Sequence, residues 1–516
     1  MKLALIQLQG HDISDYRETL EEILQMTEQA CQSGADLVLL PECAYPAYYI
    51  GLDETRDSLR ETIRLLDALS ALAKLYRSYI VIGIALEEGG ELYNSAVVFD
   101  RTGALANRAD KSNLWHFDRK WFAAGRPAQV FDTDFGRVGV MVCADGRIPE
   151  IARLLRLKGA GLILDCVNLV ASAASPQQLT NQQYQFILQA RAKENGVYIA
   201  VCDKAGVESG VITFLGRSFI TAPDGSMPVQ CSPDRAEIRI CELDLPRPPV
   251  QAAPRRPSLY SALTRETDAL PVAELVNRAY RLQDLTIYTS LVRYAYEDKT
   301  AYLAKACEYI QICEGIDAGL IVLPPYEGPL DCEDLSCLSK SLHGQAIVAV
   351  GIGENGGKKA VFLQKDRMIG ELYSTHLEGS PPQAKIQALK LTESIRVSAL
   401  FDREIEIPEI ARCAMLEGAD LILWFDGSGE DAFYLKWMQT RAAENKVFVA
   451  RSAACSQDDY SVLVNPDGGV ICTTFQTREH TTSGLVNTAL SKSKDVVPGT
   501  NIVFHRIPDF YKELIV

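Results

Sequence analysis

Short segments that are apolar at almost every position alternate, in the first half of the chain, with longer segments that are apolar at helical spacing. The runs LVLL (37–40), YIVIGIAL (79–86) and VGVMVC (138–143) are typical of strands covered on both faces. YRETLEEILQMTEQACQS (16–33) and IPEIARLLRLKG (148–159) have the spacing of amphipathic helices, and the second begins with a proline in a first-turn position. The pattern predicts an α/β protein in which each sheet lies between other layers.

The first residues have a less regular pattern. In LALIQLQ (3–9) polar residues begin to alternate with apolar ones, and we predict an alternating strand that faces an edge. Ser14 or Asp15 can cap the helix that follows, and Gly34 can end it. A βα unit therefore opens the chain.

The same run of motifs occurs twice. Four segments of the first half recur in the same order in the second half: GADLVLLPECAYP (34–46) as DAGLIVLPPYEGP (317–329), RIPEIARLLRLKGAGLIL (147–164) as EIPEIARCAMLEGADLIL (406–423), ARAKENGVYIA (190–200) as TRAAENKVFVA (440–450), and ITAPDGS (220–226) as LVNPDGG (463–469). Four matches in one order predict a duplicated domain.

The boundary between the two copies is predicted near 246–283. PRPPVQAAPRRP (246–257) is rich in proline and arginine, which favours an extended surface segment, and ALPVAELVNRAYRL (269–282) can form a short helix. The segment is compatible with a linker and with a strap across the first domain. The predicted domains are a catalytic domain at 1–260, a linker at 261–283 and a second domain at 284–516.

Composition narrows the function classes. With 516 residues and 47% hydrophobic content, the chain can bury two separate cores. A net charge of -15 without long acidic runs disfavours nucleic acid and anionic membranes as partners. MKLALIQLQG at the start is too short and too polar for a signal peptide, and no apolar segment approaches the ~20 residues that span a bilayer.

Fourteen cysteines without CxxC pairs predict reduced thiols in a cytoplasm and no zinc site, and the absence of a Gly-rich phosphate loop predicts no cofactor.

Three residues of the first copy can together carry out nucleophilic catalysis. Glu42 follows the strand predicted at 37–40, so its carboxylate lies where α/β sheets bind their ligands. A loop glutamate, a surface lysine such as Lys111 and a strand cysteine such as Cys143 are each common without any function. Together they supply a base, a cation for an oxyanion and a nucleophile, and the backbone N–H of Ala144 is placed to donate to the same oxyanion.

The second copy does not have these residues. Their places are taken by Pro325 for Glu42, by Leu400 or Asp402 for Cys143, depending on how a small insertion is placed, and by Ser374, Thr375 and His376 in the region of Lys111. Cys413 and His376 could suggest a Cys/His pair, but Cys413 falls in a predicted helix and is typical of core. A Cys143–His116 dyad is a minor alternative. Catalysis is therefore predicted in the first copy.

The motifs around these residues resemble those of a known family. LPECAYP, DKSNL and CADGRIPE, together with ARAKENGVYIA and the F-x-G-x-S segment from Phe214 to Ser218, are similar to the carbon–nitrogen hydrolase (nitrilase) superfamily. The resemblance covers almost all of the first half. It implies a four-layer α-β-β-α sandwich for both copies. It also implies that Glu42 is the general base and acid, that Lys111 stabilises the oxyanion, and that Cys143 forms a thioester acyl-enzyme.

The resemblance departs from the family pattern at one position. Many members have a second glutamate shortly after the lysine, and in HFDRKWFAAG this place is held by Asp118, which is one methylene shorter. Whether Asp118 keeps a positioning role is open. It is also the best argument for a different class of function, a non-catalytic small-molecule binder or scaffold.

The residues after the nucleophile bear on the reaction. CADGRIPE (143–150) is similar to the amidase and carbamoylase branches and not to the Cys-Trp-Glu of true nitrilases. We therefore predict hydrolysis of a linear amide or N-carbamoyl bond, with acyl transfer from the thioester to an amine as a further alternative. An Asp145–Arg147 ion pair is expected to pin the turn. Arg191 and Glu194 are expected to be structural, because Arg441 and Glu444 match them in the second copy.

The substrate is predicted to be a small molecule of unknown identity. The aromatic residues near Glu42 and Lys111 can line an apolar or aromatic pocket: Tyr45, Tyr48, Tyr49 and Trp115. Asp165 and Asn168 follow the strand after the nucleophile helix and can contact a polar group of the substrate. Core packing is an equal alternative for the aromatic residues. Domains of this family commonly pair through symmetric faces, so we predict that the second copy takes the partner's place in an intramolecular pseudo-dimer, with a further homo-oligomer as an option.

Overall fold

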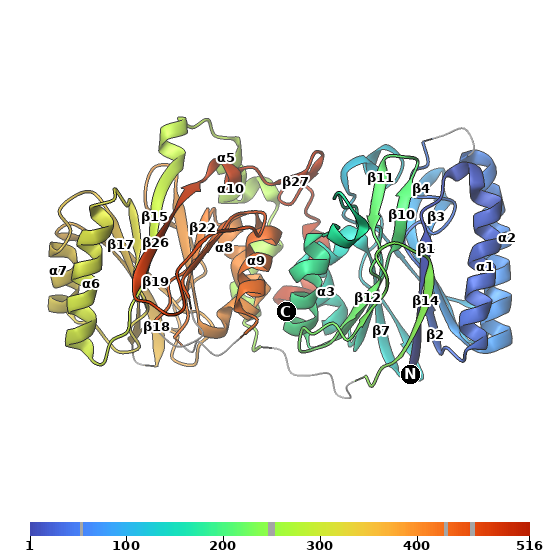
Figure 1. Cartoon of the computed structure of the whole chain (residues 1–516), viewed down its shortest axis with the longest axis horizontal. Coiled ribbons are helices and arrows are strands. Elements are labelled where there is room, and N and C mark those ends of the chain that lie inside the picture. The colour runs from blue at the N-terminus through green and yellow to red at the C-terminus, as the bar shows by residue number, and fades with distance from the viewer. Residues whose placement is uncertain (52–54, 246–252, 355, 428–431, 455–459) are drawn as a thin grey trace. The chain divides into compact units, whose positions relative to one another are not determined.

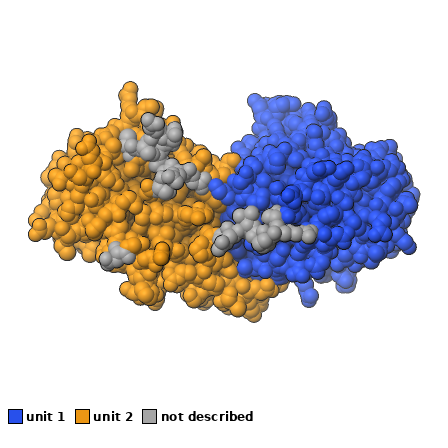
Figure 2. All heavy atoms as spheres, turned by 90° about the horizontal axis from the view of Figure 1, so that it is seen from below, with its two compact units in different colours: residues 1–252, 497–500 blue, residues 253–496, 501–516 orange. Residues whose placement is uncertain are grey.

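The computed structural model describes residues 1–51, 55–245, 253–354, 356–427, 432–454 and 460–516. These residues form two compact units, coloured separately in Figure 2: Met1–Ala252 with Val497–Thr500, and Ala253–Val496 with Asn501–Val516. Within the described ranges, no helix combines the length and the apolar character that crossing a membrane requires.

The first unit contains a large mixed sheet covered by two helices. Its strands run in the order β11 (Ile212–Leu215), β10 (Lys204–Glu208), β1 (Lys2–Gln9), β2 (Leu37–Leu39), β3 (Tyr79–Glu88), β4 (Glu91–Phe99) and β5 (Leu105–Asp110), and β14 (Glu237–Glu242) also pairs with β1. The apolar faces of α1 (Tyr16–Gln32) and α2 (Thr55–Tyr76) pack on this sheet and form one hydrophobic core with it.

The prediction of an edge-facing strand at 3–9 is wrong. β1 pairs in parallel with β2 on one side and antiparallel with β14 on the other, and its six inner residues are buried. A polar residue can lie inside this buried strand because the side chain of Gln7 is fully hydrogen-bonded within the protein. Its Oε1 accepts hydrogen bonds from the Ser218 N–H (2.8 Å) and hydroxyl (2.9 Å), and its Nε2 donates to the Ser232 carbonyl at 2.7 Å.

A second sheet of the first unit faces the first one. Its strands run in the order β13 (Val229–Gln230), β12 (Phe219–Thr221), β9 (Tyr198–Cys202), β8 (Leu162–Cys166), β7 (Gly136–Val142) and β6 (Gln129–Thr133). β7 contacts β4 and β5 of the first sheet, and the outer face is covered by α3 (Pro149–Leu157) and α4 (Leu188–Asn195). Figure 1 shows α1 and α2 on one side of the paired sheets and α3 on the other. The predicted α-β-β-α sandwich is confirmed for this unit.

The second unit has the same order of layers. One sheet consists of β19 (Arg367–Tyr373), β18 (Gly357–Gln364), β17 (Ile347–Glu354), β16 (Leu320–Val322), β15 (Thr286–Arg293) and β26 (His480–Asn487), and the other of β20 (Leu389–Lys390), β21 (Arg396–Phe401), β22 (Leu421–Phe425), β23 (Phe448–Arg451), β24 (Val462–Val464) and β25 (Val470–Thr473). The outer helices are α6 (Lys299–Glu314) and α7 (Cys332–Lys340) on one sheet, and α8 (Pro408–Leu416) and α9 (Tyr434–Asn445) on the other. Side chains from both sheets form its central core.

The segment between the repeated motifs is only partly described. Residues 246–252 of the proline-rich stretch, which we predicted to be extended, lie outside the described residues. The described part from 253 onward is grouped with the second unit and contains α5 (Pro271–Asn277) within the predicted linker. Near the C-terminal end of the chain are α10 (Ala489–Lys492) and a two-stranded ribbon of β27 (Asp495–Val497) and β28 (Thr500–Asn501).

Candidate active site

The main chain around Glu42 is fixed by a close approach to β3. The Pro41 carbonyl accepts a hydrogen bond from the Gly83 N–H at 3.0 Å, and the Ala44 N–H donates to the Gly83 carbonyl at 2.7 Å. A Cβ at Gly83 would lie only 2.5 Å from the Glu42 Cα, so glycine is required there. The Glu42 carboxylate is thereby held just beyond the carboxyl end of β2.

Lys111 lies between two buried carboxylates. It directly follows β5, and its Nζ is 2.7 Å from Glu42 Oε1 and 2.7 Å from Asp118 Oδ2, with all three side chains fully buried. The Asp118 carboxylate is itself fixed, because its Oδ2 accepts the Trp115 N–H at 2.8 Å and its Oδ1 accepts the Tyr48 hydroxyl at 2.9 Å. The shorter side chain of Asp118 therefore reaches the lysine.

Cys143 occupies a strained turn at the end of β7. Its φ of 52° lies in the left-handed region, which residues other than glycine rarely adopt, and it opens a short 3-10 helix that leads into α3. The turn is anchored through its main chain: the Cys143 N–H donates to Asp165 Oδ1 at 2.7 Å, and the Cys143 carbonyl accepts from Gln183 Nε2 at 2.9 Å. The sulfur lies 3.8 Å from the Asn168 carbonyl.

One carboxylate oxygen of Glu42 is available for proton transfer. Oε1 accepts hydrogen bonds from Lys111 Nζ and, at 2.6 Å, from Asn94 Nδ2, whereas the buried Oε2 has no hydrogen-bond partner. The Cys143 thiol is near enough to Glu42 to affect the pKa of its carboxyl group. The arrangement places a free acceptor beside a thiol.

The electrostatics of the three groups follow from their burial. Burial raises the pKa of Glu42 above its usual range, with Lys111 opposing and Asp118 adding to the shift. Burial and then the negative charge of Glu42 raise the pKa of the Cys143 thiol well above its usual value. Burial alone would lower the pKa of Lys111, but the carboxylates of Asp118 and Glu42 outweigh it and raise that pKa well above the usual value. The resting site therefore holds a charged lysine and a protonated thiol.

The remaining candidate residues have varied surroundings. Ala144 follows the nucleophile in the first turn of the 3-10 helix, where N–H groups have no partner within the helix. Asn168 is buried; its Nδ2 donates to the Glu42 carbonyl at 2.8 Å and its Oδ1 has no partner. The Arg147 guanidinium lies over the Trp115 ring at 5.2 Å. The Tyr45 hydroxyl, by contrast, donates to the Ser58 carbonyl at 2.9 Å in the helix–sheet core, away from the site.

One expectation about the turn needs correction. Asp145 does not pair with Arg147; its Oδ1 accepts the Ser112 hydroxyl at 2.8 Å and the Asn113 N–H at 2.9 Å, which ties the turn to the segment after Lys111. Asp165 accepts the Cys143 N–H with its Oδ1, whereas its buried Oδ2 has no hydrogen-bond partner, so its contact with a polar substrate group stays a prediction. Both carboxylates therefore shape the site through the backbone.

The buried arginines of α4 and α9 have the same task in the two units. Arg191 pairs with Glu194 at 2.9 Å, and its Nη2 donates to the carbonyl of Arg147 at 2.9 Å. Arg441 pairs with Glu444, and its Nε donates to the carbonyl of Ile405 at 2.8 Å. These arginines clamp the turn before the helix, in agreement with the expected structural role.

Sequence reasoning missed two side chains of the site. Asn94, whose Nδ2 bonds Glu42, is a buried polar residue next to the apolar run of β4, and that interruption was the available signal. Glu208 lies in β10 and accepts the N–H groups of Tyr48 at 2.8 Å and Tyr49 at 2.6 Å, while Lys204 neutralises it at 2.9 Å. Glu208 had no local signal, because its contacts are with residues far away in sequence.

The second unit has a different cluster at the equivalent turn. Asp402 opens the 3-10 helix before α8 with a φ of 46°, so it takes the backbone position of Cys143, and Leu400 lies inside β21. The Asp402 Oδ1 is 2.8 Å from Lys358 Nζ, and Lys358 Nζ is also 2.9 Å from Glu327 Oε1. In the second unit, a carboxylate paired with a lysine therefore takes the place of the thiol of the first unit.

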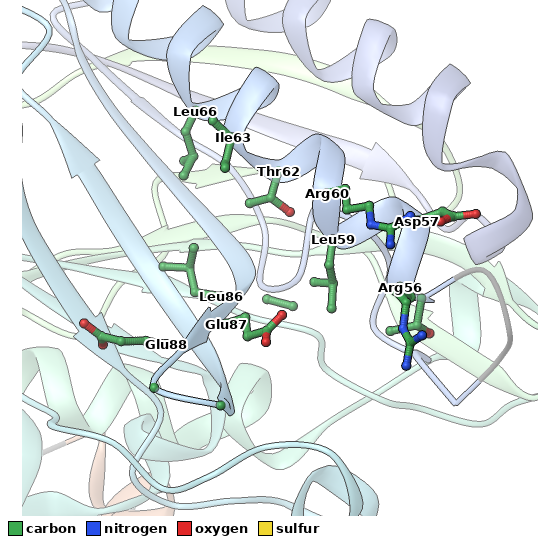
Figure 3. A pocket seen from close by; sticks show the side chains of 14 residues that line it. Arg56, Asp57, Leu59, Arg60, Thr62, Ile63, Leu66, Leu86, Glu87 and Glu88 are labelled. Atoms are coloured by element: carbon green, nitrogen blue, oxygen red, sulfur yellow. Dashed lines mark hydrogen bonds and ion pairs between the residues drawn. The ribbon is translucent and has the colours of Figure 1, made fainter.

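Other reactive groups and surfaces do not join the site. Among the described residues there is no group of three or more His, Cys, Asp or Glu that could hold a metal ion. An open groove of about 1190 Å³ lies between α2 and the β3–β4 turn, lined by residues of both charges such as Arg56, Arg60, Glu87 and Glu88 (Figure 3). Its lining does not include Glu42, Lys111 or Cys143.

The site thus combines a thiol at a strained strand–helix turn, an unbonded carboxylate oxygen and a buried lysine, which are the groups that catalysis by a cysteine nucleophile requires. Residues 2–249 match the family model of the carbon–nitrogen hydrolases. The chain therefore belongs to the carbon–nitrogen hydrolase family, as its motifs indicated.

Individual relatives are similar to about half of the chain. A nitrilase of Pyrococcus abyssi is 32% identical over 252 residues, which are 48% of this chain and 90% of that protein. An omega-amidase of Xenopus tropicalis is 29% identical over 239 residues (44% and 82%), and a citrullinase of Francisella tularensis is 25% identical over 287 residues (52% and 99%). Among solved structures, an amidase from Nesterenkonia sp. is similar with 25% identity and a TM-score of 0.42, covering 47% of this chain and 90% of that one.

Proposed function

We propose that the first unit hydrolyses the C–N bond of a linear amide or N-carbamoyl group in a small molecule, through a thioester on Cys143. The observation that carries the proposal is the buried constellation in which Glu42 has one oxygen on Lys111 and the other unbonded beside the thiol. Membership of the carbon–nitrogen hydrolase family supports the reaction class.

In the acylation half, Glu42 removes the proton from Cys143 Sγ as the sulfur attacks the carbonyl carbon. The oxyanion that forms is stabilised by the charged Lys111 Nζ and the Ala144 N–H, both preorganised in a buried site. Glu42 then gives its proton to the leaving nitrogen, the C–N bond breaks, and ammonia or an amine departs. A thioester and an ionised Glu42 remain.

In the deacylation half, Glu42 takes a proton from a water molecule, and the resulting hydroxide adds to the thioester carbon. Lys111 and Ala144 stabilise the second oxyanion as they did the first. When the C–S bond breaks, Glu42 returns the proton to the sulfur and the carboxylic or carbamic acid leaves. Asp118 is proposed to position Lys111 through their 2.7 Å contact.

Amide or N-carbamoyl substrates are favoured over nitriles by the CADGRIPE segment at 143–150. The names of two relatives, an omega-amidase and a citrullinase, support this choice, although another is a nitrilase. The buried Asn168 Oδ1, which has no partner, is proposed to accept a hydrogen bond from the substrate nitrogen. The stacked Trp115 and Arg147 are proposed to form part of the pocket wall.

The proposal is tested by incubating the full chain with a panel of linear amides, N-carbamoyl amino acids and nitriles, with Cys143→Ala as the control. Ammonia release and an acyl adduct in the intact mass, both confined to the unmodified protein, support hydrolysis. Release of the free acid without an added amine supports hydrolysis, whereas a product that forms only when an amine is added supports acyl transfer. If no compound acylates Cys143 and a small thiol reagent does not label it selectively, the non-catalytic binder becomes the better explanation.

The pH dependence of kcat/KM follows from the raised pKa of Glu42. Acylation needs the ionised carboxylate, so the rate falls as the pH drops through the pKa of Glu42 in the folded enzyme. Because burial moves that pKa upward, the acid limb is expected above pH 4.5, the ordinary value for a glutamate. Initial rates between about pH 4 and 9 measure it. An acid limb at or below the ordinary value contradicts the proton-acceptor role in this environment.

For the second unit we propose the part of a built-in partner in an intramolecular pseudo-dimer, because it has the same layers and lacks the triad. Residues 1–260 expressed alone are expected to self-associate or to lose activity, as measured by sedimentation and by initial rates. A soluble, monomeric and fully active fragment would contradict this role. The fourteen cysteines without CxxC pairs support our proposal of a cytoplasmic location, which fractionation of the source cells would test.

A further inference from the structure

The loop that carries Asp118 contacts a segment near the C-terminal end of the chain. Val497–Thr500 belongs to the first unit, although more than 240 residues separate it from the rest of that unit in sequence. No motif identified in the sequence includes these four residues. These residues contact the loop at 114–119, which carries Asp118 of the candidate active site.

Thr500 holds this loop by its hydroxyl group. Its Oγ1 accepts a hydrogen bond from the His116 N–H at 2.8 Å and donates one to the Leu114 carbonyl at 3.3 Å, and Thr500 is buried. The neighbouring Gly499 carbonyl accepts a hydrogen bond from Arg119 Nε at 3.2 Å. Three points of the loop are thus tied to two adjacent residues.

The Thr500 hydroxyl binds the loop at a residue with an unfavourable backbone conformation. His116 has a φ of 45°, in the left-handed region that is costly for a residue with a side chain. The two backbone groups that Thr500 bonds lie on either side of Trp115. The Trp115 N–H in turn donates to Asp118 Oδ2, and the Trp115 carbonyl accepts the Asp118 N–H at 2.8 Å. Fixing residues 114 and 116 therefore fixes the turn that aims Asp118.

Asp118 passes this geometry on to the reacting groups. Its Oδ2 is 2.7 Å from Lys111 Nζ, and Lys111 is 2.7 Å from Glu42 Oε1. Since a misplacement of about 1 Å at a catalytic group can reduce rates strongly, the loop must be held firmly for Lys111 to meet the oxyanion. A hydroxyl with one donor and one acceptor bond, both to backbone, is suited to that task.

We propose that Thr500 is a positioning residue for Lys111: its hydroxyl fixes the 114–119 loop and so keeps Asp118 on the lysine. The inference rests on the proposed function for its kinetic consequence, but its structural consequence is independent of any substrate. It also assigns a role in the first unit to a segment encoded at the far end of the chain.

The test compares Thr500→Val, which removes the hydroxyl at constant shape, with Thr500→Ser, which keeps it, in the full chain. Hydrogen exchange of peptides covering 112–122 is measured without substrate, since the His116 amide loses its acceptor in the valine variant. We expect faster exchange in Thr500→Val and exchange as in the unmodified protein in Thr500→Ser. With a substrate, kcat is expected to fall about tenfold or more in Thr500→Val at unchanged KM, and to recover in Thr500→Ser.

Thr62→Val is the matched control. Thr62 is a buried threonine of the same unit whose hydroxyl has no hydrogen-bond partner, so its loss should change neither exchange nor kcat. The proposal is overturned if Thr500→Val exchanges and turns over like the unmodified protein, or if Thr500→Ser is as impaired as Thr500→Val. Failure of the proposed function would show differently, as an unreactive Cys143 in a protein whose loop exchange still depends on Thr500.

Discussion

Replacing Cys143 by alanine is expected to lower kcat/KM for any amide or N-carbamoyl substrate by about 10⁵-fold or more, because no thioester can form without the sulfur. The fold should survive the change. The turn is held through main-chain bonds from Cys143 to Asp165 and Gln183, which alanine retains, and the contact of the sulfur with the Asn168 carbonyl is long, at 3.8 Å. Initial rates, thermal unfolding and intact mass after incubation with substrate measure the three consequences.

Two substitutions in the second unit serve as controls for that experiment. Cys413 is a buried residue of α8, and His376 is bonded to the Tyr260 hydroxyl at 2.7 Å. Neither is expected to change turnover when replaced by alanine, because the candidate nucleophile and base are in the other unit. Full activity in Cys143→Ala, or loss of activity only in the Cys413 variant, would refute the assignment of the nucleophile.

The layers of the first unit could be predicted because strands that are buried on both faces are apolar at nearly every position of the sequence. The runs at 37–40 and 138–143 are apolar at every position except for a glycine, and they correspond to the buried strands β2 and β7. The prediction failed at LALIQLQ, where the polar residues at Gln7 and Gln9 were interpreted as the alternation of an edge-facing strand. Its amide is satisfied by Ser218 and Ser232, which are more than 200 residues away, and no local pattern contains such partners.

The site shows the same division between local and distant information. The three candidate catalytic residues follow the ends of strands, and the structure brings Glu42, Lys111 and Cys143 together. Tyr48 was grouped with possible pocket residues, yet its hydroxyl bonds Asp118 and its backbone N–H bonds Glu208. These partners come from separate elements, so their convergence could not be read from spacing along the chain.

The second unit separates what the fold requires from what catalysis requires. Asp402 has the same left-handed φ as Cys143 although it has no sulfur. Arg441 also still binds a main-chain carbonyl of the turn, that of Ile405. The strained turn is therefore compatible with a site that cannot form a thioester, and strain alone is no sign of activity. The thiol beside the Glu42–Lys111 pair distinguishes the first unit, because the second unit has the carboxylate of Asp402, bonded to Lys358, at this place.

Replacing Glu42 by glutamine is expected to reduce kcat by roughly 10³-fold or more, since the base that serves both halves of the reaction is lost. Glutamine has the same shape and can still accept from Lys111, so the effect reports proton transfer and not packing. Glu404→Gln is the matched control: this buried carboxylate of the second unit accepts the N–H groups of Thr375 and His376 at 2.6 and 2.7 Å and has no substrate to act on. Intact mass distinguishes a trapped acyl-enzyme from a failure to acylate.

The pH dependence of the residual activity makes the Glu42→Gln experiment decisive. Without an internal base, the thiolate must form by loss of a proton to solvent, and burial raises the pKa of the Cys143 thiol well above its usual value. The residual rate should then rise about tenfold per pH unit through the neutral range, where the unmodified enzyme is flat above its acid limb. If the glutamine variant keeps kcat within about tenfold of the unmodified enzyme with an unchanged pH profile, another group takes the thiol proton and Glu42 is not the base.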